Sequence, residues 1–576
     1  NPMPAFTVRL RPALAVGAIL LFSSLPIAPG LVLAQESSSD ETAQNARKTL
    51  TKYCYDCHVG DQAEGGIQVD FLAAEGELGD HIEVVDKIIL ALKDQQMPPA
   101  DADQPEGAER VKLIEWIEQR LRQFDCGSAS RPGRVTMRRL NRTEYNNTVR
   151  DLTGLDLKLA DDFPSDDVGN GFDNIGDVLS LPPILMEKYL AAARRIADEV
   201  TASDDAVKKV FPRQPSDPKN RDEVREVTRA NVNTFASRAF RRPLDVEESD
   251  RLFQLTRAAQ EARATQEEIL QTVITAVLAS PHFIYRVEDD APEDFVDGVR
   301  ALNDFELASR LSYFLWSSMP DDRLTELATQ KKLHTAEQLK AEVDRMLADP
   351  KAAALVENFA GQWLQLRDLD ALSPDPVKFA AFDAKLRRSM RRETELLFTS
   401  IMRENRSILE LLSADYTYVD QRLARHYGIE GVNGDEFQKV DLKGKRRGVL
   451  MHGSILLLTS NPTRTSPVKR GKWVLENLLA EPPPPPPPDV PELGVAGETL
   501  GTLRQQMEQH RANPNCAVCH VKMDAVGFGL ENFDAIGSWR EADGREKIDP
   551  SGVLPGGRTF NGPLDLVQIL VEDKKS

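Results

Sequence analysis

Two short segments near opposite ends of the sequence combine two cysteines and a histidine at the same spacing. They read Cys54-Tyr-Asp-Cys57-His58 and Cys516-Ala-Val-Cys519-His520. In a Cys-x-x-Cys-His segment, the two thiols form thioether bonds to a porphyrin, and the adjacent imidazole becomes the proximal ligand of its iron. The segments use four of the five cysteines in a chain with only eight histidines, so chance is a poor explanation. The sequence therefore predicts two covalently bound haem c groups, with His58 and His520 as proximal ligands.

A zinc site or a redox-active dithiol is the alternative use of these cysteines. Each segment offers three metal ligands, whereas a structural zinc ion takes four. Joining both segments around one ion would supply six ligands, which is more than zinc takes. Haem is therefore the favoured interpretation of both segments.

Residues 40–125 have the layout of a small cytochrome c domain. A helix is expected before the first cysteine pair, and a loop rich in Gly, Asp and Glu follows it. Two more amphipathic helices come after the loop. The last of them is expected to carry Val111, Ile114, Ile117 and Leu121 on one face.

Met97 is the predicted sixth iron ligand at the first haem. It lies 39 residues after His58 (97 − 58) and is followed by Pro98 and Pro99, which end the preceding helix. A His/Met ligand pair raises the reduction potential of a haem. The alternative is a methionine that fills a gap in the core.

The second haem lacks an obvious sixth ligand. No comparable Met-Pro loop follows His520, and Met523 is only three residues, about one helical turn, away. A methionine at that spacing tends to lie on the same side of the iron as His520. His452 and His510 are the other candidates, although His510 lies on the helix expected to lead into the cysteine pair. An iron without a sixth protein ligand would suit an enzyme, whereas an iron with six ligands would only pass electrons.

Composition and the N-terminus indicate an exported protein of several domains. The chain has 576 residues, and its formal net charge of −19 argues against nucleic acid as a partner. Residues 1–34 are expected to be a secretory signal, with Met3 as a candidate initiator and a cleavage site after Ala34. An uncleaved membrane anchor is the alternative. We expect no transmembrane helix after cleavage and a periplasmic or secreted location, where c-type haem is attached.

The middle of the chain is predicted to be helical. Residues 184–430 repeat an amphipathic helical pattern with short breaks at Pro and Asp, and alternating strand patterns are scarce. We therefore expect a mainly α fold with a cytochrome c-like domain at the N-terminus, a multi-helix middle region and a second haem c domain after a tract of seven prolines at 482–488. The expected divisions are 1–34, 40–125, 131–200, 225–290, 300–430, 440–488 and 495–576.

Three further features have more than one interpretation. Residues 161–177 are dense in oxygen ligands, but Val168 occupies the third position of a calcium loop that would start at Asp166, so an EF-hand does not fit. The arginines of residues 131–142 could face haem propionates or an acidic partner, and a solvated face is the simpler interpretation. The odd Cys126 could pair with another protein or be a buried thiol.

Several stretches resemble the planctomycete-type multi-domain cytochrome c proteins, a secreted family whose modules are mostly named as domains of unknown function. The matching stretches are Arg138–Tyr145, Phe240–Leu244, Ser280–Arg286, Ala308–Trp316, Ser466–Gly471 and Met523–Asp534. The resemblance implies two haem-bearing modules on either side of a helical middle, and it implies no known reaction. The sequence departs from the family in having Ala525 where proline is usual and in a C-terminal module that we expect to be truncated.

Three functions compete at this stage. The first is electron transfer by a di-haem cytochrome c that exchanges electrons with a redox partner protein or a small-molecule donor or acceptor. The second is a peroxidase- or oxygenase-like enzyme whose second haem is open. The third is a scaffold whose helical middle binds a partner. The sixth ligand at the second haem separates the first two functions.

Overall fold

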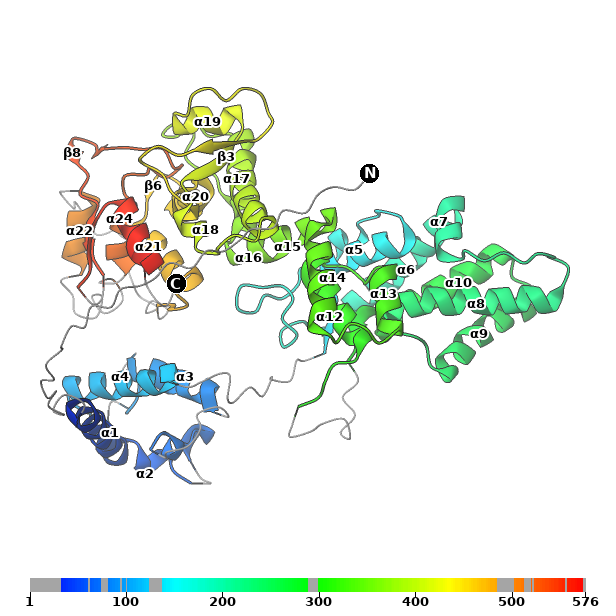
Figure 1. The fold of residues 1–576 in the computed structure, drawn as a ribbon, viewed down its shortest axis with the longest axis horizontal. Coiled ribbons are helices and arrows are strands. Elements are labelled where there is room, and N and C mark those ends of the chain that lie inside the picture. Colours follow the sequence, from blue (N-terminus) through cyan, green and yellow to red (C-terminus); the bar gives the residue numbers. More distant parts are fainter. Residues whose placement is uncertain are drawn as a thin grey trace, which may run out of the picture. The chain divides into compact units, whose positions relative to one another are not determined.

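The chain forms two compact units, Asn1–Arg131 and Pro132–Ser576 (Figure 1). In the computed structural model, the described residues are 33–60, 63–73, 81–93, 96–99, 101–123, 137–288, 299–483, 502–511, 520, 523–554 and 557–572. Both units consist mainly of helices, as the sequence predicted. Within these ranges, no helix combines the length and the apolar character that crossing a bilayer requires.

Some sequence predictions fall outside the described residues. They concern the signal peptide up to residue 32, the odd Cys126, and the second cysteine pair, Cys516 and Cys519. His520, which follows that pair, is described, and so are most residues after it.

The described part of the first unit contains four helices around one apolar core. They are α1 Leu33–Tyr53, α2 Tyr55–His58, α3 Ile82–Lys93 and α4 Gly107–Gln123, with 3₁₀ turns at Glu64–Gly66 and Asp70–Leu72. Helix α4 packs against both α1 and α3. Leu50 of α1 meets Val85 and Ile89 of α3 in the core, because the last two lie four residues apart and share a helix face.

The predicted apolar face of α4 is partly wrong. Ile117 is buried as expected, but Val111 is exposed, and Leu113 and Trp116 are buried instead. The residues predicted to be buried follow the helical period. The residues that are buried follow it too, but on a face that is rotated around the helix axis. The neighbouring helices select which of the two faces is covered, and this choice is not visible within α4 itself.

The second unit is a long series of helices joined by short loops. Its first helices are α5 Arg142–Thr153, α6 Pro183–Thr201, α7 Asp204–Val210, α8 Arg221–Phe240, α9 Val246–Glu261, α10 Gln266–Leu278, α11 Pro281–Ile284, α12 Asp304–Trp316, α13 Asp322–Thr329 and α14 Ala336–Ala348. They are followed by α15 Ala353–Leu355, α16 Gly361–Trp363, α17 Ala384–Arg403, α18 Glu410–Ser413, α19 Gln421–Tyr427, α20 Gly453–Leu458, α21 Pro467–Asn477, α22 Leu503–His510 and α24 Pro563–Glu572.

The strands of this unit are short and form two-stranded antiparallel pairs. The pairs are β1 Arg138–Arg139 with β2 Tyr285–Arg286, β3 Tyr416–Val419 with β4 Gln438–Asp441, β5 Ser460–Asn461 with β6 Arg464–Thr465, β7 Ala542–Asp543 with β8 Glu546–Lys547, and β9 Ser551–Val553 with β10 Thr559–Asn561. Among the strands of the described residues, β1 and β2 are the pair that joins segments far apart in the sequence, and they bring α5 close to α11.

Side-chain caps fix where many of these helices begin. At α5, the Asn141 side chain accepts a hydrogen bond from the Glu144 N–H (2.8 Å), and the Glu144 carboxylate accepts one from the Asn141 N–H (3.2 Å). These two hydrogen bonds form a capping box, which satisfies two backbone donors at the start of the helix. The N-terminal part of the unit then encloses one core, in which α6 packs along α10.

A second core unites the segments before and after the second cysteine pair. Met390 of α17, Leu456 of α20 and Trp473 of α21 belong to the same apolar cluster as Val526 and Phe533. The chain after His520 therefore folds onto helices that precede the proline tract.

Two glycines let the backbones in this core come into contact. A Cβ atom added to Gly471 of α21 would lie 1.8 Å from the carbonyl oxygen of Met523. A Cβ atom added to Gly527 would lie 1.9 Å from the carbonyl oxygen of Pro467. Residues 523–528 are helical, so two helices cross here with no side chain between them.

We expect Gly471→Ala to destabilise the second unit strongly. The new methyl group would meet backbone atoms that no rotamer change can move away, so the cost in unfolding free energy is about 3 kcal/mol or more, at or above the upper end for overpacking. Gly361→Ala is the matched control, because its Cβ atom would meet nothing closer than the Val356 carbonyl oxygen at 3.7 Å. Chemical denaturation checks both variants, and equal stability of Gly471→Ala and the parent would contradict the close crossing.

Candidate haem sites

The first cysteine pair lies in a single helical turn at the end of α1. The His58 N–H donates to the Cys54 carbonyl oxygen at 3.0 Å, which closes the turn. Residues four apart on a helix share a face, so Cys54 and His58 are presented together, with Cys57 beside them. The turn therefore places both thiols and the imidazole where one porphyrin could meet all three.

The His58 ring is held by a backbone carbonyl. Its Nδ1 lies 2.9 Å from the Ile67 carbonyl oxygen. A carbonyl can only accept, so Nδ1 carries the proton and Nε2 is the unprotonated nitrogen that can bind iron. The same loop is fixed by the Val69 N–H, which donates to the His58 carbonyl oxygen at 3.0 Å. This arrangement fits a proximal haem ligand.

The two thiols of this segment are free. Cys54 is half-buried against the core of the first unit, and burial raises its pKa to about 11. Cys57 is exposed. Free thiols are what thioether formation requires. Within the described residues, no group of three or more His, Cys, Asp or Glu side chains is placed to hold a metal ion.

Met97 has a fixed backbone and an exposed side chain. Its N–H donates to the Ala91 carbonyl oxygen (3.2 Å), and its carbonyl oxygen accepts a hydrogen bond from Arg110 Nη1 (2.6 Å). The residue is 40% exposed. This exposure argues against a core methionine and fits a thioether that would bind iron. Ligation by Met97 remains a prediction.

His520 is held by a carboxylate instead of a carbonyl. Its Nδ1 lies 3.0 Å from Asp524 Oδ1, one helical turn further on. Asp524 is fully buried, and its Oδ2 lies 3.6 Å from Arg511 Nε without a hydrogen bond. Because a carboxylate accepts, Nδ1 carries the proton, which leaves Nε2 as the nitrogen that could bind iron. The sequence analysis missed Asp524, although the spacing of four residues was a usable signal.

The helix that carries Asp524 is anchored by a buried arginine. Arg470 of α21 donates to the carbonyl oxygens of Leu530 (2.7 Å) and Asp534 (2.9 Å) and to Glu531 Oε1 (3.0 Å). Both terminal nitrogens of this buried guanidinium therefore have acceptors, whereas its Nε has none. It joins two of the stretches that carry the family resemblance, Ser466–Gly471 and Met523–Asp534.

The structure argues against His452 as the sixth ligand of the second haem. Its Nδ1 lies 2.9 Å from Thr394 Oγ1, and its Nε2 lies 3.5 Å from Thr417 Oγ1. Burial lowers the pKa of His452 to about 3, so the ring is neutral and part of a buried polar network with α17 and β3. Both ring nitrogens therefore already face side-chain partners.

Met523 is also poorly placed for that role. It is buried, its backbone contacts α21 at Gly471, and it lies three residues from His520 on a helical segment. A side chain at this spacing shares the face of His520 and cannot reach the opposite side of an iron bound there. The side chain of His510 lies outside the described residues.

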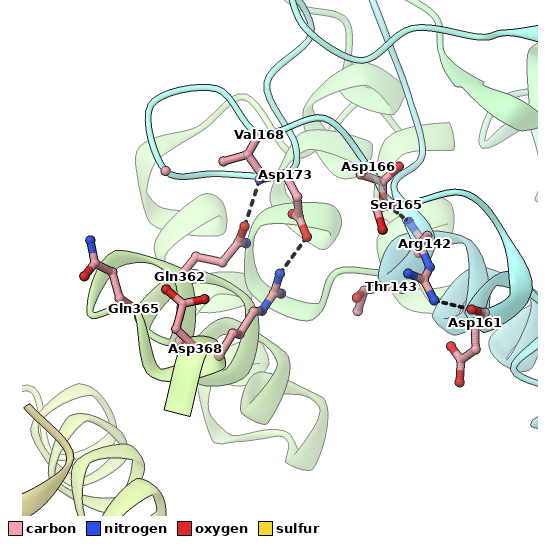
Figure 2. Close-up of a pocket in the computed structure, with 13 residues that line it drawn as sticks. Arg142, Thr143, Asp161, Ser165, Asp166, Val168, Asp173, Gln362, Gln365 and Asp368 are labelled. Carbon is pink, nitrogen blue, oxygen red and sulfur yellow. Dashed lines mark hydrogen bonds and ion pairs between the residues drawn. The ribbon is translucent and has the colours of Figure 1, made fainter. Parts of the chain in front are cut away.

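The oxygen-rich segment contributes two of its carboxylates to ion pairs within the fold. Asp166 pairs with Arg139 at 2.6 Å, and Asp173 pairs with Arg367 at 2.6 Å. Figure 2 shows these carboxylates around a cavity of about 490 Å³, with Gln362 bonded to the Asp173 N–H at 2.8 Å. The carboxylates thus have cationic partners from the protein itself.

The interpretation of the arginine cluster as a solvated face is wrong for its described members. Arg139 is buried with Asp166, and Arg138 makes two hydrogen bonds of 2.7 Å to Glu144. Arg142 donates through Nε to the Ala160 carbonyl oxygen at 2.7 Å. Their partners come from other parts of the fold or from the capping box, so the cluster is structural.

Five family models match the chain, one after another. The model described as planctomycete cytochrome C matches residues 54–101. Four models described as proteins of unknown function match residues 138–202 (DUF1587), 227–288 (DUF1595), 302–429 (DUF1592) and 446–543 (DUF1588, PSCyt3). No curated protein and no solved structure matches the chain.

These matches agree with the motifs and with the geometry at His58. Cytochrome c domains imply covalently bound haem c, and the first cysteine pair lies inside the planctomycete cytochrome C match. The second pair lies inside the DUF1588 match. The chain belongs to the planctomycete family of multi-domain cytochrome c proteins.

Proposed function

We infer that this protein is an exported di-haem cytochrome c that transfers electrons. The observation that carries the inference is the state of its two proximal histidines. In both His58 and His520, Nδ1 faces a hydrogen-bond acceptor, so Nε2 is left as the nitrogen for iron. Haem would supply the electron-carrying group, and Cys54, Cys57, Cys516 and Cys519 would hold it covalently.

The two histidines differ in the charge of their acceptor. His58 faces the neutral carbonyl of Ile67, whereas His520 faces the carboxylate of Asp524. A carboxylate makes the imidazole a stronger donor to iron and so favours the ferric state, whereas a methionine ligand favours the ferrous state. We therefore place the second haem at the lower potential, which directs electrons from the His520 site to the His58 site and then to a redox partner protein or small-molecule acceptor.

Substitution of Met97 tests the carrier function at the first haem. We expect Met97→Ala to lose the weak near-infrared methionine-to-iron band completely and to lower the potential of that haem. Met186→Ala is the matched control, because Met186 is similarly exposed (38%) and lies in the second unit. Absorption spectra and a redox titration measure both effects.

Two outcomes would contradict the proposal. A near-infrared band that survives in Met97→Ala would assign the sixth ligand to another residue. A second haem that is high-spin in the ferric state and reacts with peroxide would favour the enzyme over the electron carrier. Resonance Raman spin-state markers, recorded with the first haem reduced, distinguish these cases.

A further inference from the structure

Two of the stretches that carry the family resemblance meet at a pocket that the haem function does not use. The pocket lies in the second unit and has a volume of about 580 Å³. Its lining includes Arg241 and Arg242 from Phe240–Leu244, and His282 and Arg286 from Ser280–Arg286. We call it the arginine pocket. A third stretch, Arg138–Tyr145, borders it through the pairing of β1 with β2.

The strand pairing brings two arginines together and leaves one of them without a carboxylate. Arg138 of β1 is the direct cross-strand neighbour of Arg286 of β2. Like charges at such positions destabilise a strand pair. Arg138 is compensated by its two hydrogen bonds to Glu144. Arg286 forms no ion pair with a described carboxylate.

Arg286 is a buried cation with an unused donor. Its Nε is buried and has no hydrogen-bond partner, and its guanidinium carbon lies 5.2 Å from the centre of the Tyr313 ring. Burial lowers the pKa of Arg286 to about 10, so the group keeps its charge at neutral pH. A buried charge is costly unless an opposite charge and hydrogen bonds compensate it. Ring contact alone supplies neither.

Arg241 is a second positively charged residue next to the Tyr313 ring. It donates to the carbonyl oxygens of His282 (2.7 Å) and Tyr285 (2.6 Å) and to the Tyr313 hydroxyl (3.2 Å). These partners satisfy its donors but carry no net charge. The region around Tyr313 therefore holds two guanidinium groups that lack a carboxylate partner.

The other charged side chains at the pocket already have hydrogen-bond or ion-pair partners within the protein. Arg242 makes two hydrogen bonds of 2.8 Å to Glu248. Glu306 pairs with Arg300 at 2.8 Å, and the Asp245 carboxylate accepts a hydrogen bond from the Glu248 N–H at the start of α9. None of these acidic groups is bonded to Arg286. Glu144 attracts Arg286 only through space and is itself bonded to Arg138, so Arg286 has no carboxylate partner of its own among the described residues.

We propose that the arginine pocket binds a small ligand through an oxyanion group, with Arg286 as the principal donor. A guanidinium presents parallel N–H donors that match the two oxygens of a carboxylate, phosphate or sulfate group. The shared chemistry is a compact anion with at least two acceptor oxygens. Such a ligand would bind the guanidinium group from the pocket side and balance the positive charge that Arg286 carries beside Tyr313.

Titration calorimetry on the full-length, haem-loaded protein tests the proposal. The probes are inorganic phosphate, sulfate and acetate, with chloride at matched ionic strength as the reference. We expect saturable binding of at least one oxyanion to the parent protein and none of chloride. Arg286→Gln should weaken that binding at least tenfold. Arg257→Gln is the matched control, because Arg257 is an exposed residue of α9 whose charge pairs with Glu261 outside the pocket, and it should bind as the parent does.

The outcomes separate a binding role from a structural one. Absence of saturable oxyanion binding to the parent would overturn the proposal, and so would equal binding by Arg286→Gln. If circular dichroism shows that Arg286→Gln is unfolded, Arg286→Lys replaces it. That variant keeps the positive charge but loses the parallel N–H donors of the guanidinium group. It should therefore bind the oxyanion more weakly than the parent. Unchanged affinity in a folded Arg286→Lys variant would contradict a guanidinium site.

Discussion

Removing the first cysteine pair by Cys54→Ala with Cys57→Ala should halve the covalent haem of the protein, and removing both pairs should abolish it. Each pair is expected to form the thioether bonds of one haem, so each loss removes one attachment. Cys516→Ala with Cys519→Ala should likewise leave one haem. Haem-stained denaturing gels detect the attachment, and a haem assay of the pyridine complex gives the amount per chain.

Cys126→Ala is the control for this series, because it removes the one cysteine that belongs to neither pair. It should keep both haems. Haem stain in the variant without Cys54, Cys57, Cys516 and Cys519 would reject covalent attachment at these sites. If loss of the second pair alone leaves the haem content unchanged, the protein carries one covalent haem instead of two.

Asp524→Asn should raise the potential of the second haem and leave that of the first haem unchanged. The asparagine oxygen can still accept from His520 Nδ1, so the ring orientation is kept while the negative charge is lost. Outer-shell partners of metal ligands typically act at the level of tenfold or more. A tenfold loss of preference for ferric iron corresponds to a rise of about 59 mV for a one-electron couple. A spectroelectrochemical titration that resolves two steps measures the change.

The control for Asp524→Asn is Asp565→Asn. Asp565 accepts a hydrogen bond from the Asn561 N–H at 3.0 Å near the start of α24, so the variant makes the same charge change without touching His520. It should leave both potentials where they are. Equal shifts in the two variants would show that only the net charge of the unit matters, and an unchanged Asp524→Asn variant would remove the basis for a low-potential second haem.

Local patterns predicted much of the fold and of the first site. The helical character of the chain and the end of α3 ahead of Pro98 and Pro99 depend on neighbours in the sequence, and the structure confirms both. The segment from Cys54 to His58 is also local, because a single helical turn gathers its side chains. These features follow from backbone geometry and need no knowledge of distant contacts.

What the sequence could not give depends on contacts between distant segments. The pairing of Arg139 with Asp166 joins residues 27 positions apart, and Arg286 lies opposite Arg138 only because β1 meets β2. His452 looked like a free ligand because Thr394 and Thr417, which surround it, are tens of residues away in the sequence. Asp524 differs from these cases, since its distance of four residues from His520 could have been read directly.

The crossing of α21 with residues 523–528 also limits how this family can recombine. At positions 471 and 527, only glycine leaves room for the backbone of the other helix, at Met523 and Pro467 respectively. A chimera whose breakpoint fell in the proline tract would join an α21 from one ancestor to residues 523–528 from another. A single added methyl group on either side would then prevent their contact. The two segments are therefore expected to be inherited together, and the DUF1588 match, which spans residues 446–543, treats them as one module.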